Sequence, residues 1–167
     1  MPELRITKSN PALRDARGVY LRPEEWTSIS DVGKSTSMDE YLRVESAYLD
    51  VALAFLEEAK VDRLVIRWDP QEVRPPAQYR NGQALTLPEL RMAMQRVLRE
   101  EMWARFEGEP GTFIHFGYDY YMFLGVPYDC PKSRALAAAR GLFVEEWVSP
   151  LHPEPELDED GRQVSEP

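Results

Sequence analysis

The sequence predicts an α+β fold in which about three helices pack against one face of a mostly antiparallel sheet. Its 167 residues are 43% hydrophobic and 29% charged, the balance of an ordinary globular domain. Apolar residues recur at helical spacing in three separate stretches. Between these stretches lie short runs rich in β-branched and aromatic residues, several of them consecutive, as in an antiparallel sheet. We therefore expect a single domain over residues 1–150.

The beginning of the chain carries the weakest signals. Residues 1–18 contain Pro, Asn, Asp and Gly with few apolar positions, and they predict an irregular entry segment. Residues 19–21 predict a short strand that Pro23 ends. Residues 24–34 predict a loop or a turn of helix.

A long amphipathic helix is expected over residues 38–60. Ser37 and Glu40 have the spacing of a capping box, which satisfies free N–H groups at a helix start. The run that follows, residues 63–68, is rich in apolar and β-branched residues and predicts a strand. Residues 70–82 contain two prolines in a row and an Asn-Gly pair, and they predict a loop.

A second helix is expected over residues 87–101. Thr86 and Glu89 repeat the capping-box spacing, and Pro88 lies in the first turn, where its missing N–H costs little. The strong periodicity then ends, and residues 102–107 predict a strand.

A hairpin of two strands is predicted over residues 112–116 and 120–124, joined by a short loop that contains Gly117. Both faces of these strands carry large apolar side chains, which places them near the middle of the sheet. A third helix over residues 131–140 and a final strand over residues 142–148 complete the predicted domain.

Composition also limits the class of protein. Cys130 is the one cysteine, which excludes a disulfide within the chain and a zinc site built from several thiolates. We expect no metal and no cofactor. Apolar runs stay well short of the roughly 20 residues of a membrane span. The first residues have no apolar core of a signal peptide, so we expect a cytoplasmic protein without membrane association.

The net charge of −9 disfavours a nucleic-acid partner, because such partners need a basic surface. Residues 153–167 hold six acidic residues and one basic residue, so −5 of this charge lies at the C-terminal end. We expect residues 151–167 to form an acidic, disordered tail, since they contain few apolar side chains to bury. An acidic surface steers the chain toward basic partners.

Few residues suggest catalysis. His115 and Cys130 are candidates for a nucleophilic pair, but their separation matches no catalytic signature. We expect a half-buried histidine and an inert thiol instead, and we assign no catalytic residue. An alternative is a small cytoplasmic hydrolase whose fold brings Asp119 or Glu107 to His115.

Tyrosine and aspartate gather around the predicted hairpin. Tyrosine side chains at a polar rim bury apolar area and still form hydrogen bonds, as in many protein interfaces, although some of these rings are expected in the core. The residues that we predict to face a partner are Glu107, Glu109, Tyr118, Asp119, Tyr121 and Asp129.

The hairpin segment, residues 113–127, is one of three stretches that resemble a known class of proteins. Together with residues 24–26 and 41–48, it resembles small bacterial immunity proteins encoded beside polymorphic toxins of contact-dependent or type VI secretion systems. The resemblance implies an acidic, cofactor-free cytoplasmic protein that binds a toxin domain and blocks its active site. It assigns no individual residue.

The expected function is therefore the neutralisation of a cognate toxin by binding and occlusion, and a toxin with a basic active-site cleft would suit the acidic residues of the hairpin. Two alternatives stay open besides this one. The first is the hydrolase described above. The second is a homo-oligomeric module whose aromatic residues pair with a second copy, since the sequence leaves the oligomeric state undetermined.

Overall fold

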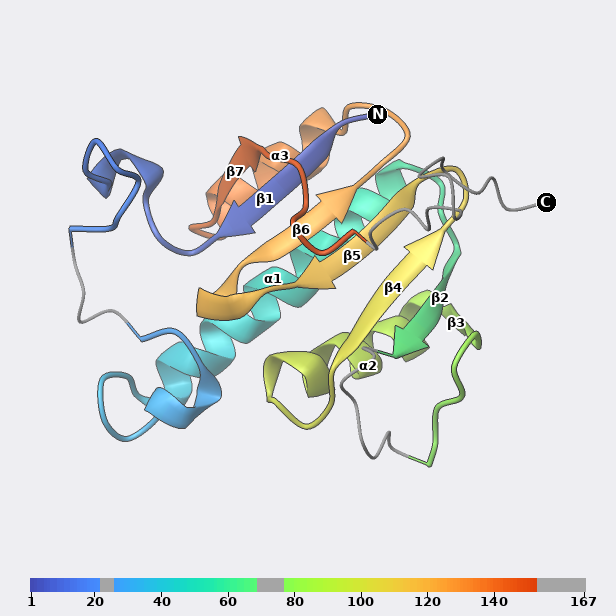
Figure 1. Ribbon diagram of the computed structural model, residues 1–167, viewed down its shortest axis with the longest axis horizontal. Coiled ribbons are helices and arrows are strands. Elements are labelled where there is room, and N and C mark those ends of the chain that lie inside the picture. Colours follow the sequence, from blue (N-terminus) through green and yellow to red (C-terminus); the bar gives the residue numbers. More distant parts are fainter. Residues whose placement is uncertain (22–25, 69–76, 153–167) are drawn as a thin grey trace, which may run out of the picture.

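A computed structural model describes residues 1–21, 26–68 and 77–152, and within them the predicted α+β fold is confirmed (Figure 1). The strands form one antiparallel sheet in the order β3-β2-β4-β5-β6-β1-β7. They are β1 (Glu3–Thr7), β2 (Arg63–Trp68), β3 (Ala84–Thr86), β4 (Ala104–Gly108), β5 (Thr112–Phe116), β6 (Met122–Gly125) and β7 (Phe143–Glu146). The helices are α1 (Met38–Glu58), α2 (Leu87–Leu98) and α3 (Pro131–Ala139), with short 3-10 turns η1 (Pro11–Leu13), η2 (Ile29–Asp31) and η3 (Tyr118–Tyr120).

All three helices cover the same face of the sheet, with α1 running along its middle (Figure 1). Both predicted helix starts are observed. The Ser37 hydroxyl accepts from the Glu40 N–H at 3.2 Å, but the Glu40 carboxylate pairs with Arg43 instead of completing the box. At the start of α2, the Glu89 carboxylate accepts from both the N–H and the hydroxyl of Thr86.

The core lies between this helix layer and the sheet. Alternate residues of the central strands point toward the helices and are fully buried, as period-2 strands with one covered face require. The strands contribute Leu4, Ile6, Leu64, Ile66, Phe106, Ile114 and Leu124, and α1 contributes Tyr41, Tyr48, Phe55 and Leu56. β5 and β6 occupy the middle of the sheet, as predicted.

The largest correction concerns the N-terminus. The prediction of an irregular segment over residues 1–18 was wrong, because β1 lies between β6 and β7 and pairs with both. Its apolar alternation consists of Leu4 and Ile6 alone, too short a pattern to identify a strand locally. The strand predicted over residues 19–21 was also wrong, since only a single bridge joins Tyr20 to Arg14.

Two further differences concern the stretch before α2. β3 lies at one edge of the sheet and was not predicted, because three residues carry no readable alternation. The predicted loop over residues 70–82 falls largely on residues 69–76, which lie outside the described part, and residues 77–82 that follow contain turns.

The opposite face of the sheet carries no helix in the described part, and a C-terminal segment crosses it instead (Figure 1). We call residues 147–152 the strap. It begins after β7, where the Trp147 N–H donates to the Glu3 carbonyl at 2.9 Å. None of the described helices is long and apolar enough to cross a lipid bilayer.

Candidate partner-binding face

The strap is attached to the helix-free face by side chains of β1 and β5. Ser149 is buried, and its hydroxyl lies 3.0 Å from His115 Nδ1. The Ser149 N–H donates to the Glu3 carboxylate, which also lies 2.9 Å from His152 Nε2. Burial opposes ionisation of Glu3, but these two contacts outweigh it and lower the pKa of its carboxyl.

The expected tail therefore starts within a segment that contacts the sheet. The Leu151 carbonyl accepts from Arg105 Nη1 at 3.1 Å, and His152 contacts Glu3. Residues 153–167, which hold most of the expected tail, lie outside the described residues.

Beside the strap lies an open depression of about 520 Å³, lined by Arg67, Glu107 and His115 among others. Glu107 Oε1 lies 3.9 Å from His115 Nε2 and 3.9 Å from Arg105 Nε. These distances are too long for hydrogen bonds, and all three atoms are buried without a partner. Burial, together with the nearby charges of His152 and Arg105, lowers the pKa of His115 to about 3, so its ring is neutral.

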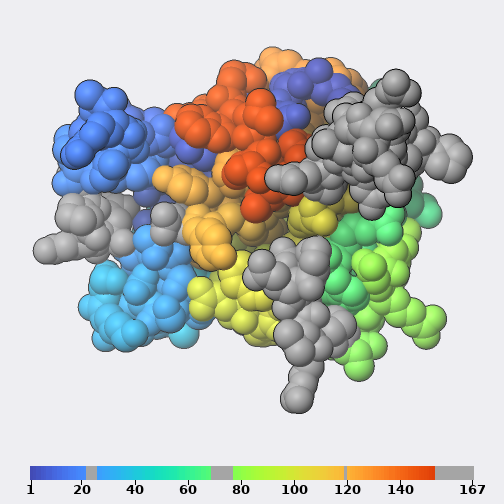
Figure 2. Space-filling model, viewed as in Figure 1, coloured from blue at the N-terminus to red at the C-terminus, as the bar shows by residue number. Residues whose placement is uncertain are grey.

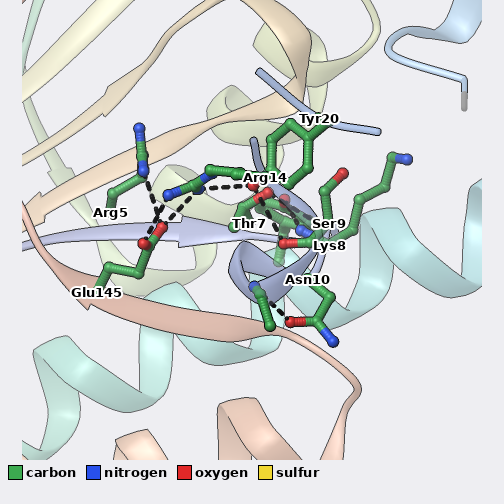
Figure 3. A network of polar contacts seen from close by, with 10 residues as sticks. Arg5, Thr7, Lys8, Ser9, Asn10, Arg14, Tyr20 and Glu145 are labelled. Atoms are coloured by element: carbon green, nitrogen blue, oxygen red, sulfur yellow. Dashed lines mark hydrogen bonds and ion pairs between the residues drawn. The ribbon is translucent and has the colours of Figure 1, made fainter. Parts of the chain in front are cut away.

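An arginine–glutamate network occupies the same face at the edge formed by β1 and β7 (Figure 3). Figure 3 shows the Glu145 side chain between Arg5 and Arg14. Its carboxylate accepts from Arg5 at 2.9 Å and twice from Arg14 at 2.8 Å. The Arg14 guanidinium also donates to the Tyr20 hydroxyl, so Arg14 links Tyr20 to Glu145 of β7. The Trp147 ring stacks on the Arg5 guanidinium of this network, with the guanidinium carbon 3.6 Å from the ring centre.

An apolar pocket of about 220 Å³ lies at the end of the sheet where α2 ends and η3 begins. We call it the aromatic pocket; its rings are Trp103, Phe116, Tyr118, Tyr120 and Tyr121. Trp103 and Tyr118 have ring centroids 6.2 Å apart and are 46% and 81% exposed. Figure 2 views the molecule from the helix-free side, where residues near 118 project from the surface beside those that follow α2.

Tyr120 is the buried ring of this pocket. Its ring packs in the core against Trp26, Tyr41 and Tyr48, with centroid distances of 5.2, 6.1 and 5.0 Å. Its backbone has a φ of 60°, the left-handed region that bulky residues rarely adopt. Because Tyr120 points inward at the end of a one-turn 3-10 segment, Tyr118 is left outside.

The predicted partner-facing residues lie in three places. Glu107 and Glu109 lie at the turn between β4 and β5, whereas Tyr118 and Tyr121 lie at the other end of β5, roughly 15 Å away along the strand. Asp129 precedes α3 and pairs with Arg134 at 2.8 Å. The sixth, Asp119, belongs to η3, but its side chain lies outside the described part.

The structure therefore separates Glu107, Glu109 and Asp129 from Tyr118 and Tyr121. Glu107 is flanked by the guanidinium groups of Arg67 and Arg105 at 3.8 and 3.9 Å, so its charge is partly balanced. The Tyr121 ring centre lies 5.0 Å from the Arg5 guanidinium, which pairs with Glu145.

Sequence reasoning missed Trp103, Trp147 and the arginine–glutamate network. Alternation along the predicted strand 102–107 places Trp103 on the same face as Glu107, and that signal was available. Trp147 follows a strand, and no local pattern indicates that it returns across the sheet.

The thiol and the histidine considered as a nucleophilic pair are not brought together. Cys130 is buried on the helix side, 3.9 Å from the Phe55 carbonyl of α1, whereas His115 faces the strap on the other side of the sheet. Burial, reinforced by the charges of Glu58 and Asp129, raises the pKa of the Cys130 thiol.

Among the described residues, no three His, Cys, Asp or Glu side chains gather closely enough to hold a metal ion. Comparisons of the chain with protein-family models, with curated proteins and with solved structures found no match.

Proposed function

We propose that the protein is a bacterial immunity protein that binds a cognate toxin in the cytoplasm and neutralises it by occlusion. The observation that carries the proposal is the cluster of exposed rings around the aromatic pocket. Trp103 and Tyr118 are the residue types that dominate binding energy at protein interfaces, and here they lie together on a helix-free face.

The overall charge supports the same class of partner. A net charge of −9 favours encounter with a basic protein surface, such as the cleft of a toxin that acts on nucleic acid. Glu109 at the turn between β4 and β5 is exposed and makes no ion pair with another described residue, so it is available to such a partner.

The test is the affinity for the toxin domain encoded by the neighbouring gene, measured by calorimetry together with inhibition of the toxin. We expect binding below micromolar concentration, and Tyr118→Ala weakens it about tenfold or more. Met92→Ala is the matched control, because Met92 is 59% exposed but lies on α2 in the helix layer. Wild-type protein that neither binds at micromolar concentration nor inhibits the toxin contradicts the proposal.

A second candidate function, a hydrolase, is favoured by one specific observation. The fold brings Glu107 to His115 at the depression, with Ser149 on the other ring nitrogen. However, a histidine that stays neutral down to about pH 3 is a weak base, and Ser149, which belongs to the strap, is buried. Turnover of ester or amide substrates that Glu107→Gln abolishes would favour the hydrolase over the immunity protein.

A further inference from the structure

We infer that the aromatic pocket is the anchor point of the interface and takes one large apolar side chain of the partner, followed or preceded by a Lys or Arg that faces Glu100. The inference rests on the proposed function for the identity of the partner. The chemistry of the occupant follows from the pocket itself.

The size of the pocket selects a side chain rather than a free small molecule. Sites for small molecules usually enclose about 300–1,000 Å³, and this pocket holds about 220 Å³. Its lining combines Leu98 and Val97 from the end of α2 with the five aromatic rings named above. An apolar side chain from a protein surface fills such a space and excludes water from it.

The rim of the pocket is organised before any partner arrives. Tyr120 and Glu100, which both line it, have left-handed backbones, with φ of 60° and 59°. The Tyr48 hydroxyl donates to the Tyr120 carbonyl at 2.7 Å and holds the first of these conformations in place. Binding therefore orders few additional side chains, which is how preorganised surfaces gain affinity.

The charge of the residues that line the pocket indicates which kind of partner residue lies next to the apolar side chain. Among the described residues that line the pocket, Glu100 is the one with a charged side chain, and it is exposed. It forms no ion pair with any residue in the described part of the chain, whereas the adjacent Glu101 pairs with Arg96 at 3.1 Å. An unpaired carboxylate beside an apolar cavity fits an apolar side chain next to a cationic one.

The chemistry of the pocket is testable without the partner. The protein is labelled with 5-fluorotryptophan, and N-acetylphenylalanine amide is added at millimolar concentrations while the four tryptophan signals are followed by fluorine NMR. We expect a saturable shift of the Trp103 signal that Tyr118→Ala removes, with Trp147 unaffected. No shift of Trp103, or equal shifts of Trp103 and Trp147, overturns the inference.

The second part uses the toxin domain. We expect Trp103→Ala and Glu100→Lys each to weaken binding about tenfold or more, and Val148→Ala to change it less than about twofold. Val148 is the matched control because it is 70% exposed on the strap, away from the pocket. Glu100→Lys keeps the test decisive if Trp103→Ala does not fold.

The outcomes separate the two proposals. Wild-type protein that does not bind the toxin contradicts the proposed function, while the fluorine experiment still decides the chemistry of the pocket. Wild-type binding that neither pocket variant weakens overturns the inference and leaves the proposed function standing. Light scattering that shows a dimer, which Tyr118→Ala dissociates, identifies a second copy as the occupant and also overturns the inference.

Discussion

Tyr48 joins two distant parts of the chain through one buried hydroxyl group. It accepts from the Lys8 N–H at 2.8 Å and donates to the Tyr120 carbonyl at 2.7 Å. Complete burial raises the pKa of Tyr48, so the hydroxyl keeps its proton and remains a donor. The residue thus connects the end of β1 to η3, on which the exposed position of Tyr118 depends.

Tyr48→Phe is expected to lower the free energy of unfolding by about 2 kcal/mol, because it leaves two backbone groups without a partner. Denaturant unfolding measures the change. Tyr41→Phe is the matched control, since among the described residues the Tyr41 hydroxyl bonds to one backbone group, the Leu98 carbonyl. A loss for Tyr48→Phe no larger than that for Tyr41→Phe would contradict this reading of the two hydroxyl groups.

His115 makes the stability of the fold depend on pH. The unfolded chain takes up a proton on this ring near pH 6.5, whereas the folded chain does so only at about pH 3, mainly because the ring is buried. Between these values the unfolded state binds more protons, so acidification favours unfolding.

We expect wild-type protein to lose about 2 kcal/mol of its free energy of unfolding between pH 6.5 and pH 5, where carboxyl groups contribute little. His115→Gln removes this slope while retaining a polar partner for Ser149. Denaturant unfolding of both proteins at several pH values measures this pH dependence. Parallel pH profiles for the two proteins would show that His115 is accessible to protons in the folded state.

At the scale of elements, the arginine–glutamate network holds the segment after β1 against β7. Glu145 lies 140 residues from Arg5 in the sequence, and its carboxylate also accepts from Arg14. Burial opposes ionisation of Glu145, but the hydrogen bonds from Arg14 and Arg5 outweigh it and lower the pKa of its carboxyl. The single β-bridge between Arg14 and Tyr20 adds little backbone pairing to hold this segment.

Glu145→Gln is therefore expected to loosen residues 8–21 locally without unfolding the sheet. Hydrogen exchange of the Leu21 amide, which donates to the Leu13 carbonyl, should become about tenfold faster. Glu146→Gln is the control, because Glu146 is exposed and pairs with Arg134 instead. Equal acceleration in both variants would mean that the network does not hold the segment.

At the scale of the whole molecule, the net charge affects the rate of association with a partner more than the affinity for it. With a net charge of −9, of which −5 lies in residues 153–167, attraction to a basic toxin acts over roughly 10 Å at moderate salt. Such steering raises association rates and is screened by added salt, whereas packing in the aromatic pocket governs dissociation.

We expect the association rate with the toxin domain to fall about tenfold or more as salt rises, with a much smaller change in dissociation. Glu109→Lys should slow association more than Glu57→Lys, because Glu109 lies at an end of the helix-free face and Glu57 lies on α1. Both variants change the net charge equally. Surface plasmon resonance measures the rates, and equal slowing would show that only total charge matters.

The sequence by itself determined the parts of the fold that depend on local periodicity. α1 and α2 fall within the predicted ranges 38–60 and 87–101, and the strands of the central hairpin lie within a few residues of theirs. Each of these elements repeats its apolar pattern over several turns or alternations, and that repeat depends only on neighbouring residues.

Tertiary structure alone decided where the edges and the candidate site lie. β1 enters the sheet by pairing with β6 and β7, more than 100 residues away, and the strap returns over His115 from the other end of the chain. Of the predicted partner-facing residues, it left Tyr118 beside Trp103 and placed Glu107 beside Arg67. Such contacts join segments whose separation along the chain no local pattern encodes, because their free energy arises only when both segments are packed.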